Sequence, residues 1–150
     1  MTLVLQKDVL IVDDDEATRA VICTALTAAG LTCDTAADGV EALEQLAGTC
    51  YAFVLLDLGM PRLDGRGLLE QLRTTPMPSA ERPIVLVVTA SGEREALHAV
   101  SDLVQIVIRK PFELSALTEL VQDCAAARSD LRLGRGNILT MPSRQARTDH

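Results

Sequence analysis

The sequence predicts an α/β fold in which five buried parallel strands form one sheet with helices on both faces. Short, wholly apolar runs alternate along the chain with longer segments in which apolar residues recur at helical spacing. Strands that are apolar throughout are typical of a sheet that is covered on both sides. A length of 150 residues suits one ordinary domain, and a hydrophobic content of 48% provides its core.

The first half of the expected fold begins with an apolar strand, Val9–Val12, which runs directly into four acidic residues. Acidic side chains stabilise the positive N-terminal end of a helix, so a helix should begin there and stop near Gly30. A modest strand is expected at Leu31–Ala36. Asp38 and Glu41 then have the spacing of a capping box, which predicts the start of a second helix.

The second half of the chain continues this alternation. The central strand, Phe53–Leu56, carries Asp57 at the point where it leaves the core. Ile84–Val88 is the most apolar strand, and Ile106–Ile108 is the fifth. Helices are expected between and after these strands, where apolar residues keep helical spacing or Ser91 supplies a cap. One helix should begin at Asp64–Gly65, and a short one should run from Glu93 to about Val100. The last helix should carry Leu114, Leu117, Leu120, Val121 and Cys124.

The C-terminal residues differ from the rest in composition. After about Ala127 the helical periodicity fades, and residues 125–150 hold five arginines and two aspartates. A domain is therefore expected over residues 1–127, followed by a basic, flexible tail over residues 128–150. A longer last helix or a segment that docks on a partner is the alternative. The tail is too short to form a helix-turn-helix output domain.

Charge and cysteine content exclude several classes of protein. The net charge of -7 argues against nucleic acid or an anionic membrane as the partner of the main body. No basic start is followed by a long apolar run, so neither a signal peptide nor a membrane span is expected. The cysteines lack CxxC spacing, and reduced, mostly buried thiols in a cytoplasmic protein are expected. They are Cys23, Cys33, Cys50 and Cys124.

The charged and polar residues that stand out all follow expected strands. Asp13 and Asp14 follow the first, Asp57 the third, Thr89 the fourth and Lys110 the fifth. Sites in open parallel sheets form outside the carboxyl ends of the strands. If the first and third strands are neighbours, three carboxylates share one small space, where they repel one another unless a divalent cation binds. Oxygen ligands alone suit Mg²⁺, and Lys110 adds a second positive charge.

Each of these residues has an ordinary structural explanation when it is taken alone. The acidic run could be only the start of a helix, and Asp57 could cap a turn. Thr89 could be a turn residue, and Lys110 could be a solvated lysine of a loop. Their joint placement at four strand ends is what predicts a functional site.

Four motifs of the chain resemble those of the receiver domain of two-component response regulators. The resemblance covers about residues 7–126 and implies a doubly wound, flavodoxin-like sheet. It identifies the chain as a stand-alone receiver, or as a receiver cut from a larger regulator or hybrid kinase. The motifs are Val9–Asp14, Leu56–Pro61 with Gly65, Val88–Ala90, and Lys110–Phe112.

The resemblance assigns a role to the acidic residues. It implies that Asp57 is the phosphoacceptor, which takes a phosphoryl group from the histidine of a sensor kinase or of a histidine phosphotransfer protein. It further implies that Asp14, Asp57 and the Gly59 carbonyl bind Mg²⁺ directly, and that Asp13 acts mainly through water. Phosphoryl transfer agrees with such a site, because it needs positioning and charge neutralisation more than covalent help.

The resemblance also assigns Thr89 and Lys110 to the phosphoryl oxygens and makes the Pro111 peptide cis. Phosphorylation would then switch a surface built from the fourth helix, fifth strand and fifth helix, to which an unknown downstream protein binds. A homodimer through that surface is left open. Such a chain is a signalling protein rather than an enzyme, since it promotes only its own phosphorylation and dephosphorylation.

Two departures from the family pattern, at Val107 and at Asp102–Gln105, leave a second hypothesis open. Val107 replaces the aromatic residue that is usually coupled to the threonine, and Asp102–Gln105 replaces a common Gly-Ala pair. Gly59 and Ser91 offer no acid, amide or long side chain to orient water. The alternative is a receiver-like interaction module that does not depend on phosphate. An FMN carrier or a haloacid-dehalogenase-type phosphatase fits less well, because aromatics are scarce and Gly59 stands where a second aspartate is needed.

Overall fold

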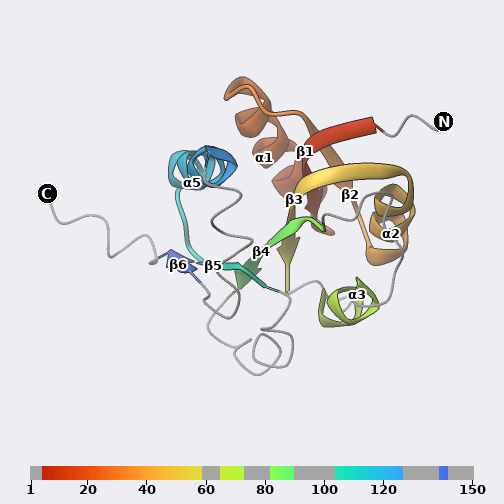
Figure 1. The fold of residues 1–150 in the computed structure, drawn as a ribbon. Coiled ribbons are helices and arrows are strands. Elements are labelled where there is room, and N and C mark those ends of the chain that lie inside the picture. The colour runs from red at the N-terminus through yellow and green to blue at the C-terminus, as the bar shows by residue number, and fades with distance from the viewer. Residues whose placement is uncertain (1–4, 59–64, 73–81, 90–103, 127–138, 142–150) are drawn as a thin grey trace, which may run out of the picture.

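The computed structural model describes residues 5–58, 65–72, 82–89, 104–126 and 139–141 (Figure 1). Within these residues, six parallel strands form one sheet in the order β2-β1-β3-β4-β5-β6. The strands are β1 (Leu5–Val12), β2 (Cys33–Ala36), β3 (Thr49–Asp57), β4 (Ile84–Thr89), β5 (Ile106–Arg109) and β6 (Leu139–Met141). The helices are α1 (Glu16–Ala28), α2 (Gly39–Gly48), α3 (Gly65–Leu72) and α5 (Leu114–Ala126).

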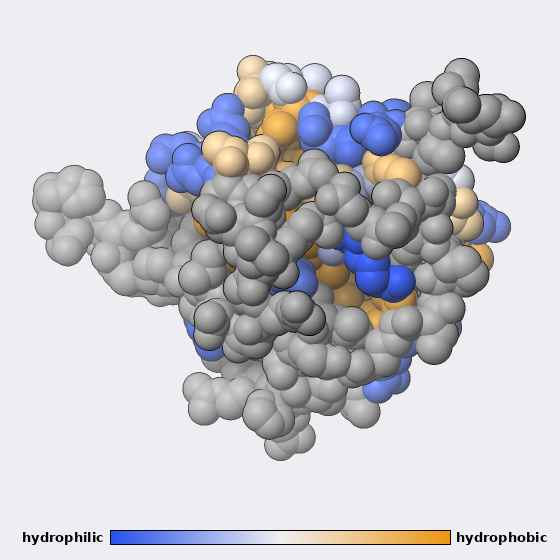
Figure 2. All heavy atoms as spheres, viewed as in Figure 1, coloured by the Kyte–Doolittle hydropathy of each residue, from blue (hydrophilic) through white to orange (hydrophobic). Residues whose placement is uncertain are grey.

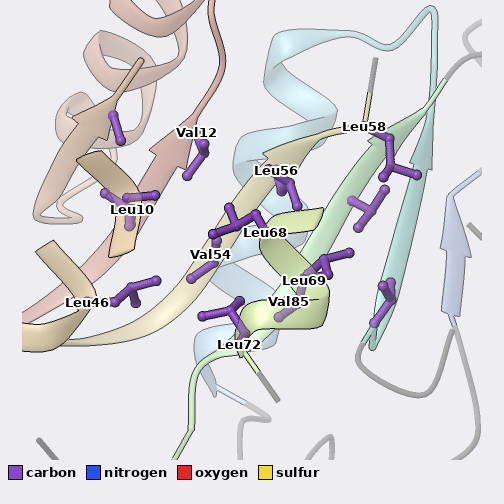
Figure 3. Close-up of a cluster of buried hydrophobic side chains, with 14 of the residues drawn as sticks. Leu10, Val12, Leu46, Val54, Leu56, Leu58, Leu68, Leu69, Leu72 and Val85 are labelled. Carbon is purple, nitrogen blue, oxygen red and sulfur yellow. The ribbon is translucent and has the colours of Figure 1, made fainter. Parts of the chain in front are cut away.

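Helices cover both faces of the sheet, as the sequence predicts. One apolar layer joins the sheet to α2 and α3, and it contains Leu10 and Val12 of β1 (Figure 3). A second layer joins the opposite face to α1 and α5, and it contains Val9 and Ile11. Successive residues of a strand point to opposite faces, so the apolar run of β1 supplies both layers. In the view of Figure 2, strongly hydrophilic residues lie around the outside of the described part, with some hydrophobic residues among them.

The starts of the first two helices follow the expected capping chemistry. The Asp15 side chain accepts a hydrogen bond from the Thr18 N–H at 3.0 Å and caps α1. The Asp38 side chain does the same for α2, where the Glu41 N–H donates at 2.8 Å. Gly30 follows the end of α1 with a φ of 93°, a backbone conformation that residues with a Cβ rarely adopt. Both helix starts and the stop at Gly30 are therefore confirmed.

The five expected strands are present, but β1 and β3 are longer than expected and β2, expected at Leu31–Ala36, is shorter. β3 begins at Thr49, where it pairs with Leu5 of β1, although Thr49 and Cys50 are not part of an apolar run. The expected helix from Glu93 to about Val100 lies outside the described residues. Within the described residues, no helix is both long enough and apolar enough to cross a membrane.

The expectation of a flexible tail over residues 128–150 stays a prediction, but residues 139–141 within it are extended. They form β6, which pairs with β5 in the register Val107↔Thr140. An edge strand presents unpaired N–H and C=O groups, and a short extended segment of the same chain satisfies some of them. The rest of residues 128–150 lies outside the described residues. The four cysteines are free thiols, but only Cys124 is buried and the other three are half-buried, so "mostly buried" is wrong.

A polar cluster lies under α2. Tyr51 is only 4% exposed, and its hydroxyl donates to the Asp34 carboxylate at 2.5 Å. Lys7 donates to the other oxygen of that carboxylate at 2.8 Å. Burial alone would raise the pKa of Asp34, but the hydrogen bonds from Lys7 and Tyr51 lower it below its ordinary value.

Tyr51→Phe is expected to lower the free energy of unfolding by about 1–2 kcal/mol at pH 7, since it removes a hydrogen bond to a charged, partly buried group. A lowered folded pKa means that this stabilisation is present above the unfolded pKa and is lost as pH falls through the folded pKa. Urea unfolding of both proteins at pH 7 and near pH 3 checks the difference. A difference of the same size at both pH values would contradict the role of the charged carboxylate.

Candidate functional site

The carboxyl ends of four neighbouring strands meet at one edge of the sheet. The register pairs Val12 of β1 with Leu56 of β3, and Asp57 of β3 with Val88 of β4. It also pairs Thr89 of β4 with Arg109 of β5. The residues at or just after these strand ends are therefore neighbours in space, and this edge is where ligand sites form in open parallel sheets.

The contact at the centre of this edge joins Asp57 to Lys110. The Lys110 Nζ lies 3.2 Å from Asp57 Oδ2. The Asp57 side chain is 11% exposed, whereas that of Lys110 is 44% exposed. The Lys110 main-chain N–H donates to the Thr89 carbonyl at 2.9 Å, and the Lys110–Pro111 peptide is cis, as the resemblance implies. The lysine is thus tied to β4 through its main chain while its ammonium group faces the carboxylate.

An open cleft lies over this pair. Its volume is about 490 Å³, and both Asp13 and Asp14 line it together with Asp57 and Lys110. Asp13 is buried, and Asp14 is half-buried. The structure thus brings together four of the predicted site residues, all facing one space that a small phosphorylated group could enter. The remaining lining residues are Asp15, Thr18, Pro111 and Phe112.

The electrostatics of Asp13 show how crowded the carboxylates are. Burial raises the pKa of Asp13, and the neighbouring Asp57 and Asp14 raise it further. The Asp15 N–H, which donates to Asp13 Oδ1 at 2.9 Å, and the charge of Lys110 act in the opposite direction, but the pKa stays above its ordinary value. The protein therefore holds a negative charge here that it would hold more easily with a cation in the cleft.

Asp13→Asn is expected to stabilise the protein at pH 7 without divalent cations, by about 0.5–2 kcal/mol. Because the pKa of Asp13 is higher in the folded state than in the unfolded state, the native protein holds this proton more tightly than the unfolded chain does. Stability is therefore lost as pH rises from the unfolded pKa through the folded pKa of Asp13. Urea unfolding in EDTA at pH 7 measures the gain, which should vanish below the unfolded pKa. Asp15→Asn is the control, because the Thr18 hydroxyl lowers the pKa of Asp15 and no gain should follow.

The cleft offers a cation only a few oxygen ligands from the described residues. Within the described residues, no group of three or more His, Cys, Asp or Glu side chains is arranged to hold a metal ion. The resemblance implies direct binding by Asp14 and Asp57, and both carboxylates line the cleft, whereas Gly59 lies outside the described residues. Mg²⁺ is usually held by one or two carboxylates and keeps several waters, so this donor set fits Mg²⁺ better than a cation that needs a full protein cage.

The other predicted residues have different outcomes. Thr89 ends β4 and is 1% exposed, and among the described residues it is not part of the cleft lining. Val107 is 2% exposed and packs in the layer under α2 and α3, so it is a core residue of β5. Gln105, within the replaced Gly-Ala region, uses its side-chain oxygen to accept from the Val85 N–H at 2.7 Å. Ser91 lies outside the described residues.

Sequence reasoning missed two residues beside the cleft. Arg19 donates through Nη1 to the main-chain carbonyl of Asp13 at 2.7 Å. Phe112 lines both the cleft and a neighbouring apolar groove of about 320 Å³. The motif Lys110–Phe112 resembles the family pattern, but the sequence alone indicates no role for the Phe112 side chain. For Arg19, the signal was its place on the first turn of an acid-capped helix.

Comparison with known proteins shows to which family the chain belongs. The family model of the response regulator receiver domain matches residues 9–122. The chain belongs to the response regulator receiver family. The matched residues run from β1 into α5, so the receiver includes every strand end that forms the cleft.

Related receivers occur within longer proteins. The DNA-binding transcriptional regulator NtrC of Escherichia coli is 36% identical over 115 residues, which are 76% of this chain and 24% of that protein. Response regulator MprA of Mycobacterium ulcerans is 36% identical over 109 residues, which are 73% of this chain and 46% of that protein. The receiver thus spans less than half the length of these curated relatives.

The fold is also that of solved receivers. The signal receiver domain of a response regulator from Bermanella marisrubri superimposes with a TM-score of 0.71 at 32% identity. The match covers 80% of this chain and 98% of that one. The predicted fold, a parallel α/β sheet of the flavodoxin-like receiver type, is confirmed.

Proposed function

We propose that this receiver accepts a phosphoryl group on Asp57 from the phosphohistidine of a sensor kinase or a histidine phosphotransfer protein. The observation that carries the proposal is the contact of 3.2 Å between Lys110 Nζ and a buried Asp57 carboxylate at the base of an open acidic cleft. A buried aspartate that faces both a cation and solvent is suited to accept a group that brings negative charge with it.

The reaction follows from these positions. A carboxylate oxygen of Asp57 attacks the phosphorus, the P–N bond of the phosphohistidine breaks, and its electron pair returns to the imidazole. The product is an acyl phosphate on Asp57. Lys110 is placed to interact with the oxygens of the transferred group, which carry the negative charge. Mg²⁺, held by Asp14, Asp57 and the Gly59 carbonyl with Asp13 acting through water, would supply further neutralisation.

The surroundings of the cleft support a protein as the phosphodonor. The apolar groove that Phe112 shares with the cleft is lined by α1 residues and by Leu114 of α5. Val21, in this groove, is 53% exposed and adds an apolar side chain to its surface. A helix that carries the phosphohistidine could pack its apolar side into this groove and present the imidazole to the cleft. We place the reaction in the cytoplasm, where free thiols stay reduced.

The consequence of phosphorylation is a change in affinity for a downstream protein. Lys110 and Thr89 are joined through their main chains, so a phosphoryl group that engages Lys110 also acts on the end of β4. DNA binding belongs to NtrC by its name and is not carried over, because the match covers 24% of that protein. The acidic main body favours a protein partner over nucleic acid.

Incubation with acetyl phosphate and Mg²⁺, followed by intact mass measurement, tests the proposal. A gain of about 80 Da that EDTA prevents is expected, which corresponds to one phosphoryl group. The second candidate is a module that binds partners independently of phosphate, which the buried aliphatic Val107 favours because an aromatic switch is missing. Absence of both the adduct and beryllofluoride binding would favour that second function.

A further inference from the structure

Arg19 connects helix α1 back to the acidic turn from which the helix begins. Its Nη1 donates a hydrogen bond of 2.7 Å to the main-chain carbonyl of Asp13. The Arg19 main-chain N–H donates to the Asp15 carbonyl at 3.0 Å, as expected for the first turn of the helix. The side chain therefore reaches back beyond the start of the helix to Asp13, the first of the cleft acids.

Several hydrogen bonds hold the turn around this contact. The Asp13 N–H donates to the Ala36 carbonyl at 3.1 Å, which extends the pairing of β1 with β2. The Asp13 carboxylate accepts from the Asp15 N–H at 2.9 Å. The carbonyl that Arg19 binds belongs to the peptide unit between Asp13 and Asp14. Because a peptide unit is planar, the direction of this carbonyl fixes the direction in which the chain enters Asp14.

We infer that Arg19 is a positioning residue for the acidic turn, which holds the peptide between Asp13 and Asp14 so that the Asp14 carboxylate faces the cleft. This inference rests on the proposed function, in which Asp14 binds the divalent cation. Groups that orient metal ligands without touching the metal typically change metal affinity by roughly 10–100-fold when they are removed.

Arg19 also carries a positive charge close to the acids, and charge alone would have the opposite effect. A nearby cation repels a divalent cation, so removing the guanidinium would strengthen metal binding if Arg19 acted only through its charge. Loss of positioning would weaken it. The direction of the change in affinity therefore separates the two roles.

The experiment is titration of the full chain with Mn²⁺ alone, with the free ion counted by electron paramagnetic resonance at pH 7. Mn²⁺ is a suitable probe because it prefers the same oxygen ligands as Mg²⁺. Arg19→Met removes donor and charge, and its affinity should fall by about 10-fold or more. Arg19→Gln keeps a shorter donor without charge and should recover part of the affinity. Arg19→Lys keeps the charge and a donor but not the planar group, and it should also recover part of the Mn²⁺ affinity.

Lys7→Met is the matched control, because it removes the same charge at Asp34, far along β1 from the turn. Its Mn²⁺ affinity should stay within about 2-fold of the wild type or rise slightly. Thermal unfolding shows which variants are folded. If Arg19→Met does not fold, the Mn²⁺ affinities of Arg19→Gln and Arg19→Lys test the inference instead. Unchanged or tighter binding by the Arg19 variants would overturn the inference. Absence of Mn²⁺ binding by the wild type would overturn the proposed metal site, and the inference with it.

Discussion

Asp57→Asn is expected to abolish the gain of one phosphoryl group from acetyl phosphate. The amide is nearly the same size as the carboxylate, but it lacks the charged oxygen that must attack phosphorus. Its remaining carbonyl oxygen can still accept a hydrogen bond from Lys110, which lies 3.2 Å from the carboxylate, but the ion pair is lost. Lys110 is 44% exposed and can turn to water, so the fold should survive the change. Intact mass after incubation with Mg²⁺ measures the loss.

Other carboxylates in the cleft make a control necessary. Asp15 lines the same cleft and is the cap of α1, and asparagine caps helices as well as aspartate does. Asp15→Asn should therefore still gain the phosphoryl group. An adduct of unchanged yield in Asp57→Asn would mean that the acceptor is another residue. Loss of the adduct in both variants would mean that the turn, rather than one nucleophile, had been disturbed.

The strands and their ends were predictable because buried parallel strands read as apolar runs in the sequence. Such a run ends where the strand leaves the core, so Asp57, Thr89 and Lys110 could be placed on one edge before their contacts were known. The extra length of β3 could not be predicted, because Thr49 and Cys50 are strand residues only through pairing with β1. Tertiary pairing overrides local preference at such positions.

The contacts that complete the site could not be read from the sequence either. The hydrogen bond from Arg19 to the Asp13 carbonyl depends on the angle at which α1 leaves β1. β6 depends on an open edge of the sheet, and the tail composition, rich in arginine and glycine, gives no sign of it. A side chain that binds a distant main-chain group leaves no periodic signal, since periodicity records only which face of an element is buried.

Lys110→Met is expected to distinguish the contribution of the Lys110 ammonium group from that of the divalent cation proposed to bind beside Asp57. The rate of phosphorylation by acetyl phosphate should fall by roughly 10²–10³-fold, because a cation no longer meets the developing charge on the phosphoryl oxygens. Mn²⁺ binding should be unchanged or tighter, since one positive charge beside Asp13 and Asp57 has been removed. Time courses of intact mass and Mn²⁺ titration of the same preparation give both quantities.

The opposite directions of these effects make the result specific to the ammonium group. The main-chain bond from Lys110 to the Thr89 carbonyl does not involve the side chain and should remain. Lys110→Arg keeps the charge but spreads it over a planar group, so it should recover only part of the rate. A wild-type rate in Lys110→Met would exclude Lys110 from phosphoryl transfer. Loss of both phosphorylation and Mn²⁺ binding would instead indicate that the whole cleft had rearranged, and the paired contact with Asp57 would then be structural.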